Sequence, residues 1–283
     1  MMDLTVIGHF IHYRIYVNGY KFIYIKDINK RDMFKNSFIA TFAKIKDSEY
    51  AEELNMTNKI LIDSEEINTS NFLFYTISDY FDLENDFKLG TRSIFLNYLD
   101  LRTKNIEYSD DYQNYICSKQ ILIDNLNELI DEFENLKINL SFTNNKKELL
   151  KEVNVNLIQD ELEFNVKDLS YEEKVVFQIK LINKIAQMQD KPLLVIVDLK
   201  VITPRINMAL ENVENIDYII LVNDKFSLES EKVNHAFFDI DNSIDLYDEN
   251  QVYERLMEQE NNIRYEHFIN KLYNDELSKF LNK

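Results

Sequence analysis

The pattern of apolar and polar residues at the start of the chain predicts two adjacent β-strands. Residues 10–17 and 20–25 are rich in aromatic and β-branched side chains, and the Asn-Gly pair between them is a strong signal for a tight turn. We therefore expect 10–17 and 20–25 to pair as a β-hairpin. The pattern further predicts a helix over residues 31–45 and a short strand over 59–63.

The middle of the chain has the spacing of a packed helical arm. Between residues 112 and 136, apolar side chains recur close to the a and d positions of a heptad. A second helix is predicted over 171–188, because Ser170 and Glu173 form a capping box and Pro192 follows the segment. Both patterns indicate helices that bury one apolar face.

Two uniformly apolar stretches, residues 193–197 and 218–222, predict buried strands. The connection between them includes a helical stretch over 205–213 and is long enough for a right-handed crossover between parallel strands. Strands that are apolar on both faces belong inside a sheet that is covered on both sides. The sequence therefore predicts an α/β fold with a largely parallel sheet, followed by a charged helical tail over residues 249–283.

The strand over 193–197 ends in Asp198, the place where nucleotide hydrolases hold a magnesium-binding aspartate. A phosphate-binding loop also needs glycines, because backbone amides must approach the phosphates closely. The chain has three glycines, Gly8, Gly19 and Gly90, and none lies in a Gly-x-x-x-x-Gly-Lys-Ser/Thr or Gly-x-Gly-x-x-Gly pattern. We therefore interpret Asp198 as a structural residue that ends the strand and orients the following loop. Gly-x-Ser-x-Gly and His-Glu-x-x-His motifs are also absent, so no enzyme activity is expected.

Composition places the chain among folded proteins, since 45% of its residues are hydrophobic and 13% are aromatic. No apolar run approaches the roughly 20 residues needed to span a bilayer, so we expect a soluble cytoplasmic protein without a membrane partner. The single cysteine, Cys117, excludes a disulfide within the chain. Its apolar helical neighbours predict a buried structural thiol.

The net charge of −18 argues against a nucleic-acid partner, because DNA binding depends on cations that displace counterions from phosphates. The charge is uneven, however: residues 1–47 carry a local +4 and residues 239–262 a local −7. Such asymmetry permits a basic surface on an acidic protein.

Carboxylates gather along the middle helix. Asp124, Glu128 and Glu132 share one helical face and, with Asp110 and Asp111, could supply oxygen ligands to a hard cation such as calcium. The alternative is an acidic helix face that contacts only water. The abundance of carboxylates also leaves a metal-dependent nuclease open.

Three short segments carry a resemblance to a known family: LLKEVNV at 149–155, VDLK at 197–200 and LVND at 221–224. Together with the helices and strands around them, these segments follow the order of elements in the type II-A CRISPR adaptation protein family, Csn-two. The chain resembles this family over residues 110–248, whereas the tail, 249–283, has no counterpart in it.

Members of this family have a nucleotide-hydrolase-like α/β head without hydrolase activity, and a helical leg. The resemblance implies that residues 1–110 and 191–248 form a degenerate head without a P-loop, 111–190 the leg and 249–283 a helical tail. It further implies a homotetrameric ring that binds double-stranded DNA ends, with calcium ions held by acidic residues. Such a protein acts in spacer acquisition with the CRISPR integrase pair and the effector nuclease.

Seven cations are candidates for contacts with DNA phosphates, since a protein that accepts any DNA end needs backbone contacts and no base readout. They lie in the basic N-terminal region and at the end of the helical arm: Lys26, Lys30, Arg31, Lys35, Lys146, Lys147 and Lys151. The alternative for each is an ordinary surface side chain. The candidates for calcium are Asp124 and Glu128, with Asp110 and Asp111 as outer ligands.

A second hypothesis comes from a different class of protein. The chain could be an acidic protein–protein adaptor that docks a partner on the helical arm and tail and uses the sheet as a scaffold. The two hypotheses differ in the mass expected in solution, since the ring requires a tetramer and the adaptor does not.

Overall fold

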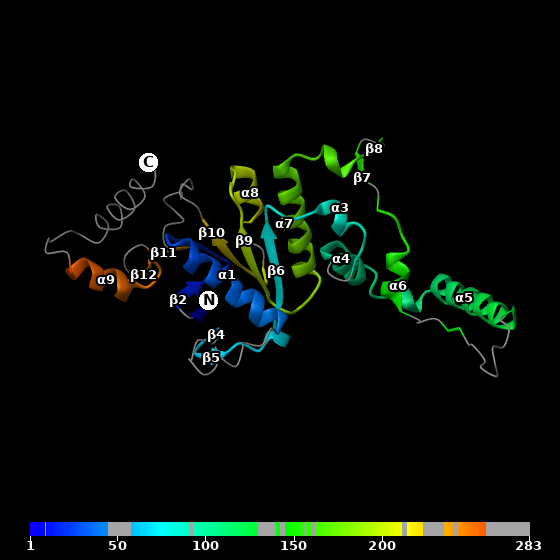
Figure 1. Cartoon of the computed structure of the whole chain (residues 1–283), viewed down its shortest axis with the longest axis horizontal. Helices are drawn as coiled ribbons and strands as arrows, with labels where there is room; N and C mark the ends of the chain where they lie inside the picture. The colour runs from blue at the N-terminus through cyan, green and yellow to red at the C-terminus, as the bar shows by residue number, and fades with distance from the viewer. Residues whose placement is uncertain are drawn as a thin grey trace. The chain divides into compact units, whose positions relative to one another are not determined.

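A computed structural model describes residues 1–8, 10–44, 58–90, 93–129, 140–141, 145–155, 157–159, 162–210, 214–222, 235–239 and 243–258. The chain divides into two compact units (Figure 1). The first comprises Met1–Phe81 and Tyr171–Lys283, and the second Asp82–Ser170. No helix within the described ranges is long and apolar enough to cross a membrane.

A six-stranded sheet forms the centre of the first unit, in the order β12-β11-β3-β10-β9-β6. Its strands are β3 (Tyr20–Ile25), β6 (Leu73–Ser78), β9 (Leu193–Asp198), β10 (Ile216–Leu221), β11 (Ala236–Asp239) and β12 (Ser243–Asp245). Neighbouring strands run parallel except for the antiparallel pair of β11 and β12. The predicted α/β fold with a largely parallel sheet is therefore confirmed, as is the parallel pairing of β9 with β10.

The first unit also contains an antiparallel sheet in the order β2-β1-β4-β5. Its strands are β1 (Met2–Gly8), β2 (Ile11–Val17), β4 (Lys59–Ile62) and β5 (Glu65–Glu66). The short strand predicted over 59–63 is β4. This sheet pairs β1 with both β2 and β4.

The predicted hairpin between residues 10–17 and 20–25 is wrong. β2 pairs instead with β1, and β3 pairs with β10 and β11 of the six-stranded sheet. The Asn-Gly pair thus marks the point where the chain passes from one sheet to the other, and Gly19 has the positive φ of 74° that favours glycine. The reason lies in burial: alternate residues of β2 are buried, whereas β3 is buried on both faces and belongs between parallel neighbours.

The helices described in the first unit are α1 (Ile28–Ala43), α7 (Tyr171–Gln187), α8 (Pro204–Ala209) and α9 (Glu249–Glu258), with the 3-10 helix η1 (Thr69–Asn71). α1 starts three residues before its predicted position because Asp27 caps it. α7 begins directly after Ser170, as the capping box predicts. Residues 211–213 of the stretch predicted to be helical, and the tail after residue 258, lie outside the described residues.

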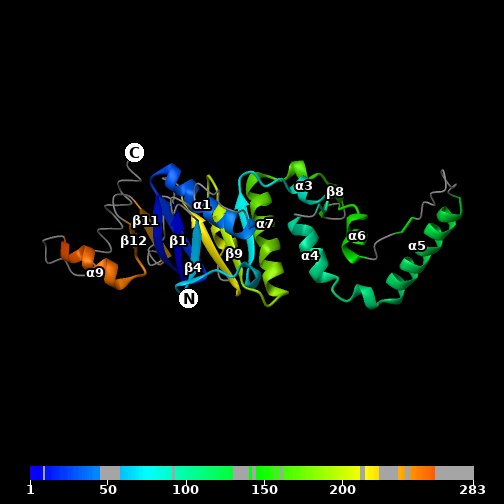
Figure 2. The ribbon, with the colours of Figure 1, turned by 60° about the horizontal axis from the view of Figure 1, so that its bottom comes forward.

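Both faces of the six-stranded sheet are covered, which explains its uniformly apolar strands. Residues 193–197 of β9 are all buried. On one face, Ile196 belongs to the same hydrophobic core as Phe34 of α1 and the buried side chains of β1 and β2. On the other face, the hydroxyl of Tyr218 donates a hydrogen bond to Asn183 of α7. Figure 2 shows α1 and α7 as separate helices flanking the strands of this unit.

The second unit is mainly helical. It contains α3 (Leu83–Asp86), α4 (Ile94–Arg102), α5 (Asp110–Leu129), α6 (Lys146–Lys151), the 3-10 helices η2 (Ile106–Tyr108) and η3 (Val166–Asp168), and a ribbon of β7 (Leu157–Gln159) with β8 (Leu162–Phe164). Leu89, Leu96 and Leu150 form a small buried core. α5 corresponds to the predicted arm over 112–136, of which 130–136 lie outside the described residues.

The second unit differs at both ends from the predicted leg of residues 111–190. It includes α3 and α4, where the carboxylate of Asp86 accepts hydrogen bonds from the backbone N–H groups of Ile94 and Phe95 at 2.7 and 3.0 Å. α7 belongs instead to the first unit, because the amide of Gln178 donates to the carbonyl oxygen of Thr76 in β6 at 3.2 Å.

Candidate functional site

The carboxyl ends of the parallel strands are where α/β proteins bind ligands, and in this chain one of the helix ends there is already occupied. β3 ends at Ile25, and α1 begins three residues later. The Asp27 carboxylate accepts hydrogen bonds from the backbone N–H groups of Asn29 at 2.8 Å and Lys30 at 3.3 Å. The positive end of the helix, which could bind a phosphate, is therefore capped by a carboxylate of the same chain.

Asp198, at the end of β9, is also engaged. Its two oxygens accept hydrogen bonds from Nη2 of Arg31 at 2.6 Å and Nζ of Lys35 at 2.7 Å. Both cations come from α1, and the Asp198 side chain is 21% exposed. Asp198 ends β9 and has structural contacts, as the sequence predicts, but its side chain fixes α1 to the edge of the sheet instead of orienting the following loop.

A second carboxylate at this edge, Asp239 at the end of β11, has a similar set of partners. It accepts a hydrogen bond from the hydroxyl of Tyr13 at 2.5 Å and lies 3.5 Å from Nζ of Lys30. Burial raises the pKa of the Tyr13 hydroxyl well above its ordinary value, and the hydrogen bond to Asp239 raises it further. Asp239 therefore links β2, α1 and β11.

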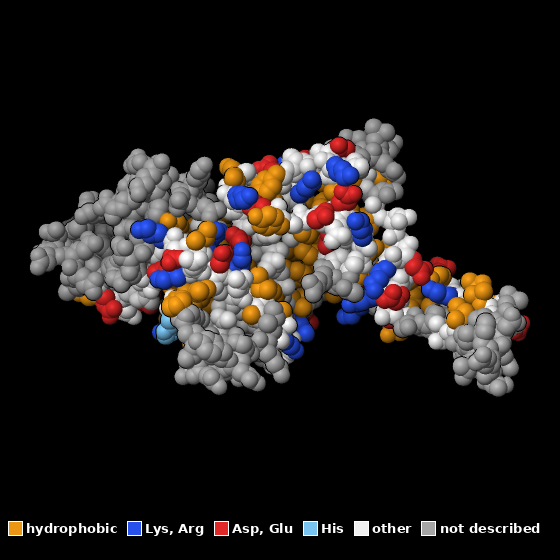
Figure 3. All heavy atoms as spheres, in the orientation of Figure 1, with side chains coloured by type: hydrophobic (Ala, Val, Ile, Leu, Met, Phe, Trp, Pro, Cys, Tyr) orange, Lys and Arg blue, Asp and Glu red, His pale blue; other side chains and the backbone are white. Residues whose placement is uncertain are grey.

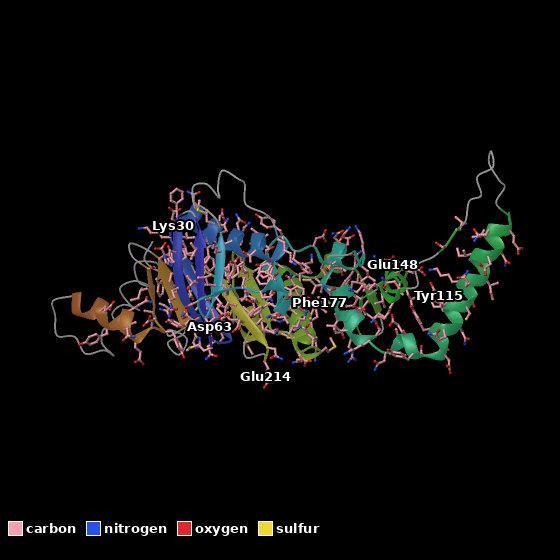
Figure 4. The ribbon with its side chains drawn as sticks, turned by 90° about the horizontal axis from the view of Figure 1, so that it is seen from below. Lys30, Asp63, Tyr115, Glu148, Phe177 and Glu214 are labelled. Atoms are coloured by element: carbon pink, nitrogen blue, oxygen red, sulfur yellow. The ribbon has the colours of Figure 1, made fainter. Side chains whose placement is uncertain are left out.

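Of the four N-terminal cations predicted to contact DNA, the structure pairs three with carboxylates: Lys30, Arg31 and Lys35. Figure 4 labels Lys30 at the start of α1. The remaining one, Lys26, has an exposed side chain, and its backbone N–H donates to the carbonyl of Asp239 at 3.0 Å. On the face drawn in Figure 3, Lys and Arg side chains are likewise interspersed with Asp and Glu. The N-terminal region is thus a surface of paired charges.

The other predicted cations lie on α6 of the second unit and are paired as well. Nζ of Lys146 lies 2.7 Å from the carboxylate of Asp100, and that of Lys147 lies 3.4 Å from it. Lys151 pairs with Glu148 on the same helix at 2.8 Å. Burial by itself would raise the pKa of Asp100, but the hydrogen bond and charge of Lys146, with Lys147, hold this pKa below its ordinary value.

Two further cations, Arg102 and Lys104, were not predicted from the sequence and lie at the C-terminal end of α4. Lys146 also donates to the carbonyl oxygen of Asp100 at 2.8 Å, at the C-terminal turn of α4. Arg102 lies in that last turn and Lys104 follows it, both with exposed side chains. A helix C-terminus attracts cations, so the basic residues at the end of α4 were the available signal.

The four carboxylates predicted to bind calcium do not come together in one chain. Asp110 and Asp111 lie in the first turn of α5, whereas Asp124 and Glu128 lie about 20–27 Å farther along the same helix. Asp124 accepts a hydrogen bond from Gln120 at 2.7 Å. Across the described parts of the chain, no group of three or more His, Cys, Asp or Glu side chains could hold a metal ion. These residues do not fit a calcium site within one chain, and calcium binding stays a prediction.

α5 exposes apolar side chains to an unusual degree. Ile121 and Leu122 are 61% and 57% exposed, and Leu126 is 39% exposed. Cys117 is exposed too, so the predicted buried thiol is wrong: the described residues do not cover this part of α5. At its start, the helix contacts the end of α6 through Tyr115, whose hydroxyl donates to Glu152 at 2.8 Å (Figure 4).

A buried ion pair of the first unit was not foreseen from the sequence. Lys21 of β3 and Asp245 of β12 form a salt bridge in which neither side chain has exposed surface. Asp245 also accepts hydrogen bonds from the backbone N–H groups of Tyr16 at 2.8 Å and Tyr247 at 2.9 Å. Burial lowers the pKa of the Lys21 ammonium group, while Asp245 opposes this shift. The one charged residue inside the apolar run of 20–25 was the available signal.

No protein-family model matches the chain, and no curated protein matches it. Its fold is similar to the crystal structure of Stu0660 of Streptococcus thermophilus, with a TM-score of 0.68. The similarity covers 96% of this chain and 84% of that chain, at 15% sequence identity. At this identity the similarity concerns the fold alone, and it extends over nearly the whole chain.

Proposed function

We propose that the chain is a non-catalytic protein that binds the ends of double-stranded DNA as a homotetrameric ring and supports spacer acquisition in type II-A CRISPR immunity. The observation that carries the proposal is an α/β head whose phosphate-binding edge is closed by its own side chains. Asp27 caps α1, and Asp198 is bonded to Arg31 and Lys35. A head of this kind, joined to a separate helical unit, is what the resemblance of 110–248 to the CRISPR adaptation family implies.

The DNA contacts of the proposal use exposed cations in and beside the two predicted basic regions, one region in each unit. These are Lys26 in the first unit and Arg102, Lys104 and Lys147 in the second. Because one chain carries a net charge of −18, a single copy would bind a duplex weakly. Several copies around one duplex would multiply the phosphate contacts, which favours an oligomer.

The direct test is electrophoretic mobility of a linear duplex and of a closed circular duplex of the same sequence, at low salt, with and without calcium. We expect binding to the linear form only, and a steep loss of affinity as salt rises. A matched pair of variants separates specific contacts from net charge: Lys147→Gln should weaken binding, while Lys184→Gln, on α7, should not. Absence of binding to the linear duplex under all conditions would refute the proposal.

One observation favours a second candidate function, an acidic adaptor. The exposed apolar side chains of α5, Ile121 and Leu122, would suit a partner helix better than DNA. Multi-angle light scattering separates the two candidates. A tetramer supports the ring, whereas a monomer that gains mass only with a partner protein supports the adaptor.

A further inference from the structure

In the contact between Arg31 and Asp198, the carboxylate accepts a hydrogen bond from Nη2 of the guanidinium group but none from Nε. Nη2 of Arg31 donates to one oxygen of Asp198, and Lys35 takes the other oxygen. Nε of Arg31 is buried and has no hydrogen-bond partner among the described residues. An Arg side chain binds an oxyanion best through two parallel N–H donors, so this donor is held beside a carboxylate that does not use it.

We propose that Arg31 and Lys35 form a binding site for a phosphate group, and that Asp198 occupies this site in the free chain. Asp198 has two oxygens and must divide them between two cations. A phosphate has more oxygens: two can accept from Nε and Nη2 of Arg31 while a third accepts from Lys35. Binding would therefore satisfy the buried Nε and displace the Asp198 carboxylate.

The charges around the site are consistent with a carboxylate, Asp198, that occupies the two cations until an anion with higher affinity displaces it. Lys35 also lies 3.8 Å from Asp32, whose side chain is 60% exposed, so water weakens that contact. The neighbouring carboxylate at the sheet edge, Asp239, is engaged separately by Tyr13 and Lys30. Asp198 is thus the carboxylate that competes directly with a phosphate for Arg31 and Lys35.

Binding of inorganic pyrophosphate to the full chain tests the site without DNA. Isothermal titration compares wild type with Asp198→Asn at constant ionic strength, with chloride as the control anion. We expect Asp198→Asn to bind pyrophosphate about tenfold more tightly than wild type. Equal affinity in the two proteins would overturn the proposal.

Two further variants distinguish binding through the specific donors of Arg31 from binding that only follows the net charge of the chain. Arg31→Lys added to Asp198→Asn keeps the charge but removes the paired donors, so most of the gain should disappear. Asp239→Asn removes an equivalent charge at the same sheet edge and should produce no gain. The proposal would be contradicted if the gain in pyrophosphate affinity persists after Arg31→Lys is added, or if Asp239→Asn produces the same gain. If Asp198→Asn does not fold, wild type and Arg31→Lys carry the test, and pyrophosphate should raise the melting temperature of wild type more.

Binding of duplexes that carry 5′-phosphate ends is then compared with binding of duplexes that carry 5′-hydroxyl ends, to identify the source of the phosphate. This comparison rests on the proposed function. Preference of Asp198→Asn for the 5′-phosphate assigns the site to a DNA end. A gain in pyrophosphate affinity without a preference for the 5′-phosphate assigns the site to a free phosphate compound. A pyrophosphate gain in a protein that binds no DNA at all would refute the proposed DNA binding and leave the phosphate site standing.

Discussion

The two units of the chain stabilise themselves in different ways. The first has an extensive core shared by two sheets and α1, and places one ion pair, Lys21 with Asp245, entirely within it. The second has a core of Leu89, Leu96 and Leu150. Its ion pairs all keep some exposure, from the partly buried pair of Lys146 with Asp100 to the more exposed pairs of Lys119 and Lys151. The first unit is therefore built to hold fixed geometry, while the second presents side chains to its surroundings.

This difference changes what a charged residue does in each unit. A buried pair is costly to break, because one partner is left as an uncompensated charge away from water. A surface pair contributes little, since water solvates either partner alone. A fully buried cation such as Lys21 should therefore act through structure, and the more exposed cations of either unit mainly through what they bind.

The largest effect should come from Lys21→Met in the first unit. Removing the ammonium group leaves Asp245 charged and buried, and we expect the free energy of unfolding to fall by about 3–5 kcal/mol. Urea unfolding followed by circular dichroism measures the change. Arg14→Met is the matched control, because Arg14 pairs with Asp3 at 2.6 Å with a side chain that is 56% exposed. If both variants lose the same stability, burial does not distinguish the two pairs.

An intermediate effect is expected for Leu150→Ala in the second unit. Leu150 is buried with Leu89 and Leu96, and truncating such a side chain costs about 2–5 kcal/mol. Hydrogen exchange should show faster exchange of amides in α4 and α6, with β9 unchanged. Leu122→Ala, at an exposed position of α5, should leave all of them unchanged. Loss of protection in β9 would show that the two units unfold together.

The smallest effect concerns the pH dependence of the Asp100 contacts. The pKa of Asp100 in the folded chain lies below its unfolded value of about 3.9, so the folded state favours the charged form. The stabilisation is present at neutral pH and is lost as the pH falls below about 4. We expect Asp100→Asn to cost less than about 1 kcal/mol at pH 7, since the side chain is partly exposed, and less than that at pH 2. An equal cost at both pH values would exclude an electrostatic origin.

Much of the fold could be predicted from the sequence. The uniformly apolar residues 193–197 predicted a strand covered on both faces, and β9 is buried in that way. The hairpin that the Asn-Gly pair predicted does not form, because the strands on either side of this pair belong to different sheets. Residues 20–25 are nearly all apolar, whereas residues 11–17 alternate, and this contrast already separated a central parallel strand from a strand with one exposed face.

The features of the candidate sites also divide into those that the sequence determines and those that the tertiary structure decides. The sequence by itself determined that the head lacks a phosphate-binding loop, because missing glycines cannot be supplied by folding. Only the tertiary structure decided that Asp198 meets Arg31 and Lys35, and that Lys146 meets Asp100, since these partners are separated along the chain by tens to well over a hundred residues. Periodicity is a local property and reports which face of a helix or strand is buried. The partner of a charged side chain depends on which strand ends and helix ends are brought together, and that is set by the packing of the whole unit.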